Sequence, residues 1–209
     1  MGTHTGLHRS QIENDETMII GLTGYKGVGK DTVAAYLMKE HGFERKAFAD
    51  PLKQSVAALF NIPFSKVDQL KMDENCRIIV WQGPQLHPLR HADISMREFL
   101  QRYGTEAHRD TFGDDFWLDY TLPCAGFYPG RAIVVTDVRF ANEAARIRDL
   151  GGTVVRVIRE NAAPGEQTPH RSELQDFDWD YIVQNDGTLR QLYDNVEELL
   201  SVVIDRIST

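Results

Sequence analysis

The chain has 209 residues, of which 42% are apolar and 26% are charged, and these proportions are ordinary for a soluble globular protein. Its formal net charge of −8 argues against a protein that coats nucleic acid through bulk electrostatics, so any anion has to be bound locally. No apolar run approaches the roughly 20 residues of a membrane span, and residues 1–17 lack the apolar core of a signal peptide. We therefore expect one cytoplasmic α/β domain with insertions, in which Cys76 and Cys124 are reduced thiols.

The first half of the chain contains the pattern of a strand, a loop and a helix. Residues 1–17 have no periodicity and are interpreted as a flexible tail, or as the product of an early start codon. Met18 begins a short apolar run, a glycine-rich loop follows, and apolar residues then recur at helical spacing until Gly42. Asp50 suits an N-cap, and Pro51 suits the first turn of a second helix. The expected elements are a strand at 18–23, a helix at about 31–41, a strand at 43–49 and a helix from 50.

The middle of the chain is the hardest part to interpret. In residues 61–95, prolines and charged residues interrupt any periodicity. An amphipathic helix is then expected from Ser95 to His108. Its polar face would carry Arg102, Glu106 and Arg109, and its apolar face would carry Met96, Phe99, Leu100, Tyr103 and Ala107.

The second half alternates strands and helices. The spacing of Thr188 and Gln191 is that of a capping box and predicts the start of the last helix. Such alternation implies a parallel sheet covered by helices on both faces, and ligands bind at the carboxyl ends of its strands. Thr23 and Asp137 both lie at strand ends, so we expect the motifs beside them to meet. The expected elements are strands at 131–136, 153–158 and 181–183, helices at 141–150 and from 188, and a loop at 160–169.

The segment from Gly24 to Lys30 fits the pattern G-x-x-x-x-G-K. Glycines let the backbone wrap closely around phosphate oxygens, and the loop N–H groups and the following helix N-terminus then point at the anion. Lys30 adds a positive charge for the β- and γ-phosphates of ATP. A simple glycine-rich turn is disfavoured, because an apolar strand precedes the loop and a helix follows it. The expected nucleotide-binding residues are Gly24, Tyr25, Lys26, Gly27, Val28, Gly29, Lys30, Asp31 and Thr32.

The residue after Lys30 departs from the usual pattern, which has Ser or Thr there to bind magnesium. Asp31 takes this place and Thr32 follows it, a spacing seen in nucleoside monophosphate kinases. Magnesium would then be bound by Thr32 or through waters. Asp31 is either a carboxylate close to the metal or a first-turn acid favoured by the helix dipole, and both interpretations stay open.

A second motif is the apolar run 133–136, which ends in the carboxylate of Asp137. Such a carboxylate holds magnesium directly or through water, and the alternative is a cap on the following helix. ATPases that hydrolyse usually place a second acid beside this Asp, whereas the next charged residue here is Arg139. An arginine near the phosphates stabilises charge on a transferring phosphoryl group, so the motif favours a kinase over an ATPase.

A third set of polar and aromatic residues lies between Gln101 and Trp117. Arginine forks bind a monophosphate and an aromatic ring can stack on a base, but the charged outer face of a helix explains the same pattern. Asp50 is either only an N-cap or a contact to the acceptor. His170 lies in a loop, where a solvated role is the default.

Several segments together resemble the bacteriophage-type deoxynucleoside monophosphate kinases, and they run in order over nearly the whole chain from Met18. The run D-V-R-F-x-N-E that starts at Asp137 and the segment Gly104-Thr105-Glu106 are much more specific than the P-loop. The matching segments are 29–32, 48–53, 100–106, 115–117, 137–143, 170–173 and 185–188.

The resemblance implies an adenylate-kinase-like α/β fold with a P-loop core, an acceptor-binding insertion at about 50–117 and a mobile lid at about 159–175. It implies ATP, Mg²⁺ and a deoxynucleoside 5′-monophosphate, with no nucleic acid or membrane as partner, in the host cytoplasm if the chain is phage-encoded. The oligomeric state, including a homodimer, is left open. The implied catalytic groups are Lys30, Arg109, Arg139 and Asp50, the metal ligands are Asp137, Thr32 and Asp31, and the substrate contacts are Asp50, Lys53, Gln101, Arg102, Arg109, Trp117, Arg139, Asn142, Arg159, His170 and Arg171.

Two other functions compete with this one. The first is a P-loop kinase for another acceptor, such as a small metabolite or a modified base in DNA, and the acidic net charge disfavours the DNA version. The second is a nucleotide-binding module without catalysis, which could have lost Lys30 or Asp137, whereas both are intact.

Overall fold

The computed structural model describes residues 17–81, 91–124, 127–160 and 177–207. The chain forms two compact units: the first combines Met1–Ala47 with Leu122–Thr209, and the second is Phe48–Thr121. The first unit contains the glycine-rich loop. The second lies in the part of the chain where the sequence predicts an acceptor-binding insertion, and that role stays a prediction.

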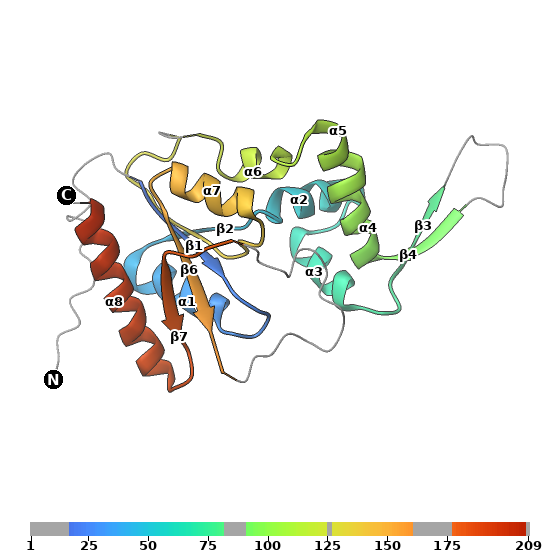
Figure 1. Cartoon of the computed structure of the whole chain (residues 1–209). Helices are drawn as coiled ribbons and strands as arrows, with labels where there is room; N and C mark the ends of the chain where they lie inside the picture. Colours follow the sequence, from blue (N-terminus) through green and yellow to red (C-terminus); the bar gives the residue numbers. More distant parts are fainter. Residues whose placement is uncertain (1–16, 82–90, 125–126, 161–176, 208–209) are drawn as a thin grey trace. The chain divides into compact units, whose positions relative to one another are not determined.

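The first unit contains a parallel sheet of five strands in the order β2-β5-β1-β6-β7 (Figure 1). β1 lies in the middle, where its Ile20 is paired with Val134 of β5 and with Thr153 of β6. A central strand of a parallel sheet is buried on both faces, which is why β1 is a continuous apolar run. The strands are β1 (Met18–Thr23), β2 (Glu44–Lys46), β5 (Ala132–Val135), β6 (Thr153–Ile158) and β7 (Tyr181–Gln184).

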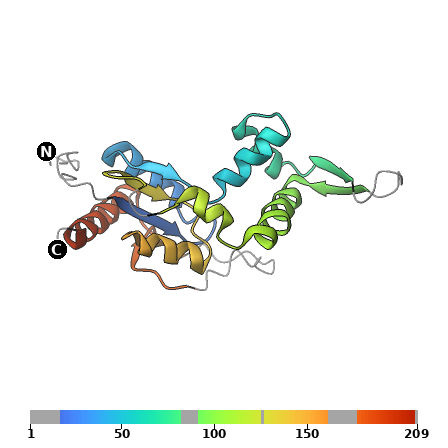
Figure 2. The same ribbon diagram turned by 90° about the horizontal axis from the view of Figure 1, so that it is seen from above.

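Helices cover both faces of this sheet, so the predicted α/β class is confirmed. On one face, Leu22 packs in a single core with Val33 of α1 and Leu199 of α8. On the other face lies α7, whose Ile147 takes the space beside Gly21, because a Cβ there would lie 2.4 Å from Ile147 Cδ1. Figures 1 and 2 show α7 on the opposite side of the sheet from α1. These helices are α1 (Lys30–His41), α7 (Ala141–Asp149) and α8 (Leu189–Ile207).

The ends of two predicted elements can be compared with the structure. The capping box before α8 is confirmed: Gln191 Oε1 accepts the N–H of Thr188 at 2.8 Å, and Thr188 Oγ1 accepts that of Gln191 at 3.3 Å. The strand expected at 43–49 is wrong in extent, since β2 is an edge strand of three residues. The chain turns directly from it into the next helix, whose N-cap is Ala49 rather than Asp50.

The second unit consists of short helices and one antiparallel hairpin around a small core. Within 61–95, which the sequence left without assignment, the described residues include α3 and the antiparallel pair of β3 and β4. Their patterns are weak because α3 buries only Val67, and Ile79 of the hairpin is 62% exposed. The elements of this unit include α2 (Asp50–Leu59), α3 (Phe64–Met72), β3 (Arg77–Trp81), β4 (His91–Ser95), α4 (Met96–Gly104), α5 (Asp110–Phe112) and α6 (Phe116–Thr121).

The helix expected at 95–108 is interrupted by a π turn, η2 (Thr105–Arg109), which follows α4 directly. A π turn bonds residue i to i+5 and so holds an extra residue, which moves the buried face along by one position. Gly104 is buried and His108 is half-buried, whereas Ala107 is exposed. The prediction that Ala107 belongs to the apolar face is therefore wrong.

The two cysteines are free thiols, as expected. Within the part of the chain that the structure describes, even the longest helix, α8, lacks an apolar stretch that would let it cross a bilayer.

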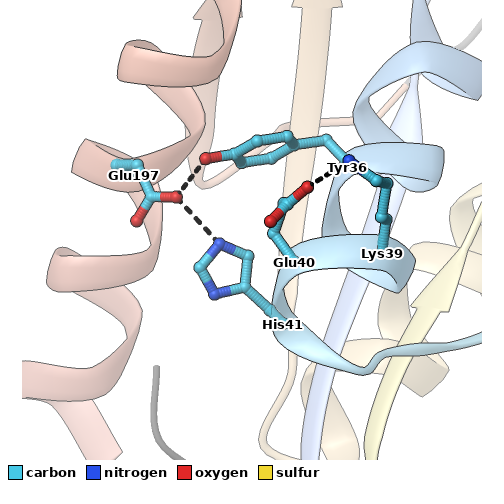
Figure 3. A network of polar contacts seen from close by, with 5 residues as sticks. All are labelled: Tyr36, Lys39, Glu40, His41 and Glu197. Atoms are coloured by element: carbon cyan, nitrogen blue, oxygen red, sulfur yellow. Dashed lines mark hydrogen bonds and ion pairs between the residues drawn. The ribbon is translucent and has the colours of Figure 1, made fainter. Parts of the chain in front are cut away.

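A polar cluster joins α1 to α8 (Figure 3). The Glu197 carboxylate accepts the Tyr36 O–H at 2.5 Å, and one of its oxygens lies 2.8 Å from His41 Nε2. The Tyr36 ring stacks on Tyr193, with 4.1 Å between the ring centroids. Burial, the hydrogen bond to Glu197 and the negative charge of that carboxylate raise the pKa of Tyr36. A neutral Tyr36 therefore stabilises the contact between the two helices.

We expect Tyr36→Phe to lower the free energy of unfolding by about 1 kcal/mol at neutral pH, because one hydrogen bond is lost. The pKa of Tyr36 is raised in the folded chain, so its contribution is complete below the usual tyrosine pKa of 10.0 and is lost as the pH rises further. Urea unfolding should therefore show the difference between wild type and Tyr36→Phe shrinking above about pH 10. A difference that does not change in that range would contradict this role of the hydroxyl.

Candidate active site

The loop between β1 and α1 needs glycine at two positions. Gly24 has a φ of +136° and Gly29 a φ of +104°, values that residues with a side chain rarely adopt. Both positions also lack room: a Cβ on Gly24 would lie 2.4 Å from Val157 O, and a Cβ on Gly29 would lie 2.4 Å from Asn185 Nδ2. The loop is thus packed against β6 and against the turn after β7.

Two side chains bind carbonyl groups of this loop. Lys30 Nζ donates to Gly24 O at 2.7 Å and to Tyr25 O at 2.8 Å, and Asn185 Nδ2 donates to Val28 O at 2.8 Å. The first N–H groups of any α-helix have no intrahelical partner, and the N-cap of α1 is Gly29, which makes no side-chain bond to them. Carbonyls bound by side chains and uncapped N–H groups at a helix start fit the binding of a phosphate group.

The Asp137 motif ends beside the loop, as the sequence predicts. Gly21 of β1 is paired with Val135 of β5, so the two parallel strands finish at the same edge of the sheet. Just beyond them, the Val138 N–H donates to Leu22 O at 3.1 Å. This backbone bond keeps the segment around Asp137 next to the end of β1.

Three charged groups act on Lys30 at this edge. Burial lowers the pKa of Lys30 and the charge of Arg139 lowers it further, whereas the carboxylates of Asp31 and Asp137 partly offset the shift. In the described ranges of the chain, no cluster of three or more His, Cys, Asp or Glu side chains could hold a metal ion. One or two carboxylates are nevertheless what Mg²⁺ takes from a protein when it also binds substrate phosphates and water. Asp137, Asp31 and the half-buried Thr32 therefore fit a magnesium ion that arrives with a nucleotide.

Glu143 is a buried carboxylate that the sequence analysis missed as a functional residue. It is 3% exposed, and its Oε2 accepts the backbone N–H groups of Arg139 at 2.7 Å and of Phe140 at 3.1 Å. It thereby fixes the backbone that carries the Arg139 side chain. Its place in the first turn of α7 is a capping signal that could have identified it. Asn142, an expected substrate contact in the same turn, is half-buried.

The residues expected to bind the acceptor lie on the second unit and have local partners. Lys53 Nζ lies 2.9 Å from the Asp68 carboxylate, and Arg102 pairs with Glu98 at 2.8 Å. An exposed ion pair such as Arg102–Glu98 contributes little to stability, so Arg102 can exchange it for a phosphate at low cost. The other expected contacts here are Asp50 and Arg109, both half-buried, and Gln101, which is exposed.

Trp117 lies inside the second unit. It is 5% exposed, and its Nε1–H donates to Gly104 O at 3.0 Å. On the same stretch, His108 Nδ1 lies 2.6 Å from Tyr103 O, and the rings of His108 and Trp117 are 4.8 Å apart. Both side chains bind carbonyls where α4 passes into the π turn. Stacking on a base would need an exposed ring face, so Trp117 fits better as a residue that positions this turn.

The expected lid residues are only partly described. Arg159 is exposed just after β6, while His170 and Arg171 lie outside the described residues. Beside Arg159, the N–H of Glu160 donates to Asp186 Oδ1 at 2.6 Å. Asn185 and Asp186, two adjacent residues for which the sequence indicated no role, thus bind the P-loop and the end of β6 respectively.

Comparisons with known proteins show which family the chain resembles. The family model described as deoxynucleotide monophosphate kinase matches residues 85–196. A protein of Acanthamoeba polyphaga mimivirus, provisionally named deoxynucleotide monophosphate kinase, is 30% identical over 182 residues, which are 86% of this chain and 94% of that protein. The deoxynucleotide monophosphate kinase of Escherichia phage RB69 is 28% identical over 114 residues, 51% of this chain and 45% of the phage protein. Among solved structures, a shikimate kinase from Bacteroides thetaiotaomicron covers 89% of this chain and 98% of its own, with 15% identity and a TM-score of 0.41, too distant to carry an argument.

We expect Lys30→Ala to reduce phosphoryl transfer from ATP by at least about 100-fold, because the charge that the loop offers to the phosphates is removed. The melting temperature should change little, since the hydrogen bonds described for Lys30 are to carbonyls of its own loop. Lys39→Ala is the matched control, because Lys39 lies on the same helix but is 82% exposed and pairs with Glu40. Turnover of Lys30→Ala within a few-fold of the control would refute a phosphate-binding role for the loop.

Proposed function

Because the chain belongs to the deoxynucleotide monophosphate kinase family, we propose that it transfers the γ-phosphate of ATP to a deoxynucleoside 5′-monophosphate. The products are ADP and the deoxynucleoside diphosphate. One observation carries the proposal: at the edge of the sheet, Asp31, Asp137 and Arg139 lie close enough to Lys30 to influence its pKa. Two cations and two carboxylates at one phosphate-binding loop suit a magnesium-dependent transfer between two phosphates.

The P-loop binds the donor. Its N–H groups and the first turn of α1 hold the β-phosphate region, and Lys30 leaves the carbonyls of Gly24 and Tyr25 to reach the β- and γ-phosphates. This exchange is favourable because an ammonium bonds more strongly to an anion than to a neutral carbonyl. Burial, which lowers the pKa of Lys30, also removes competing water from the contact.

A magnesium ion bound with ATP would neutralise part of the charge on the phosphates. Asp137 and Thr32 are the residues that we propose to hold it, and Asp31 adds a second carboxylate nearby. Arg139 then meets the charge that develops on the transferring group. Its backbone is fixed by Glu143, so the arginine needs little reorganisation during the reaction.

The second unit binds the acceptor in this proposal. Arg109 and Arg102 would pair with its monophosphate, with Gln101, Lys53 and Asp50 as further polar contacts. Trp117 would act through the π turn that it supports rather than by stacking. From the segment after β6, Arg159 and His170 would contribute to a lid that excludes water from the transferring phosphate.

The first test is a coupled assay of ADP release across all deoxy- and ribonucleoside monophosphates, with Mg²⁺. We expect ADP release to depend on the acceptor and to favour one or more deoxynucleotides. ADP release that is independent of any acceptor would indicate an ATPase. ATP binding with no turnover on any acceptor, including small metabolites and duplex DNA with modified bases, would indicate a nucleotide-binding module.

A second prediction concerns the acceptor alone. Arg109→Ala should raise the KM for the monophosphate and lower kcat, because a charge-assisted phosphate contact contributes roughly 1.5–3 kcal/mol. The expected loss in kcat/KM is about 10- to 100-fold, with ATP affinity almost unchanged. Arg97→Ala is the matched control, since Arg97 is an exposed arginine on the preceding helix α4. If ATP affinity collapses instead while the acceptor KM holds, Arg109 serves the donor side.

A further inference from the structure

The peptide between Val28 and Gly29 is held from outside the P-loop by one side chain. Asn185 lies directly after β7, and its backbone N–H donates to Ile158 O at 2.9 Å. Its side-chain Nδ2 donates to Val28 O at 2.8 Å, although the two residues are 157 positions apart in the sequence. The amide also packs on Gly29, where a Cβ would come within 2.4 Å of Nδ2.

This hydrogen bond sets which way the peptide faces. A trans peptide is planar, and its C=O and N–H point in opposite directions. A carbonyl of Val28 that is turned toward Asn185 therefore leaves the Gly29 N–H pointing away from Asn185. An anion is bound by N–H groups and repelled by carbonyl oxygens. If this peptide flipped, the Val28 carbonyl would take the place of the Gly29 N–H in front of the anion.

Lys30 also holds two loop carbonyls, Gly24 O and Tyr25 O, but its contacts differ from that of Asn185 when a nucleotide binds. Lys30 is itself a phosphate ligand, so it has to release those carbonyls when a nucleotide arrives. Asn185 is neutral and bonds to the opposite side of its peptide, so it can keep Val28 O through the whole cycle. The Asn185 contact then persists during nucleotide binding, whereas the Lys30 contacts are exchanged for phosphate oxygens.

The neighbours of Asn185 make it a firm support. Asp186 Oδ1 accepts the N–H of Glu160 at 2.6 Å, so the turn is bound to the chain just after β6. The turn that carries Asn185 is therefore held by the backbone after β6, independently of the P-loop that it contacts.

We propose that Asn185 is a positioning residue for nucleotide binding, which holds the Val28–Gly29 peptide so that the Gly29 N–H is presented to a phosphate oxygen of ATP. The inference deepens the proposed function, on which it rests only for the identity of the ligand. The inference concerns the ATP site and predicts that substitutions of Asn185 leave binding of the acceptor unchanged.

The test compares Asn185→Leu with Asn195→Leu. Leucine keeps the shape of the side chain and removes the donor. Asn195 of α8 is the matched control, because its Nδ2 donates to Gln184 O at 2.9 Å, a distance close to the 2.8 Å of the Asn185 bond, and its described bond is to β7 and not to the P-loop. Both variants should lose a similar, small amount of melting temperature without nucleotide. In calorimetric titrations with Mg–ATP and no acceptor, Asn185→Leu should weaken binding by about 5- to 20-fold, the range expected for one lost hydrogen bond and a less ordered loop. Asn195→Leu should stay within about two-fold of wild type.

Asn185→Asp gives a second measurement with almost no change in volume. An ionised carboxylate only accepts hydrogen bonds, so it repels Val28 O and should bind ATP more weakly than Asn185→Leu at neutral pH. Protonation restores a donor, so ATP affinity relative to Asn185→Leu should rise as the pH falls toward the usual aspartate pKa of about 4. In steady state, both variants should raise the KM for ATP and leave that for the monophosphate unchanged.

Equal ATP affinity in Asn185→Leu and Asn195→Leu would overturn the proposal, and so would an equal rise in the KM of both substrates. If Asn185→Leu does not fold, the pH dependence of ATP affinity in Asn185→Asp, measured relative to wild type, decides alone. The outcome is separable from that of the proposed function, because ATP binding is measured without an acceptor. Turnover on a different acceptor would refute the function and leave the result on Asn185 standing.

Discussion

The site depends on one constraint: an anion has to meet backbone N–H groups, so the carbonyls of the P-loop must face elsewhere. Three carbonyls of the loop have an identified side-chain partner. Lys30 takes those of Gly24 and Tyr25, and Asn185 takes that of Val28. Gly24 can approach Val157 O closely only because it has no side chain. The sheet satisfies this constraint by placing β1 between β5 and β6, so that each neighbouring strand end supplies part of the surroundings.

The same arrangement explains how a chain with a net charge of −8 can bind a polyanion. Bulk electrostatics oppose binding, so attraction must come from groups within a few ångströms of the phosphates. Burial lowers the pKa of Lys30, the nearby charge of Arg139 lowers it further, and Asp31 and Asp137 offset part of that shift. The two carboxylates would weaken phosphate binding on their own. They are useful when a divalent cation arrives with the nucleotide, because the cation needs carboxylate ligands as well as phosphates.

The sequence predicts well those features that depend on neighbouring residues. β1 is recognisable because a central strand is apolar on both faces, and α8 begins at a capping box whose two members are three positions apart. The π turn at Thr105–Arg109 could not be predicted, because α-helical spacing places Ala107 inside and the extra residue moves His108 there instead. For α3 the reason is different: a short helix that buries only Val67 leaves no periodic pattern.

The same distinction applies to the site, and it explains why some of its residues were recognised from the sequence and others were not. Glycines and Lys30 act on phosphates directly, so their spacing is a recognisable motif. Glu143 and Asn185 act on backbone groups instead: one binds the N–H groups of Arg139 and Phe140, and the other binds a carbonyl 157 residues away. A contact to a backbone group places no demand on the identity of its partner, so nothing at the partner's position reveals it. The segment around Asp137 therefore combines residues that we propose to contact the substrates with Glu143, which positions their backbone. Asn185 has the same positioning role for the P-loop. For Arg139, the residues that position it matter as much as its own charge, because a guanidinium stabilises a transition state only when its position is set before the reaction begins.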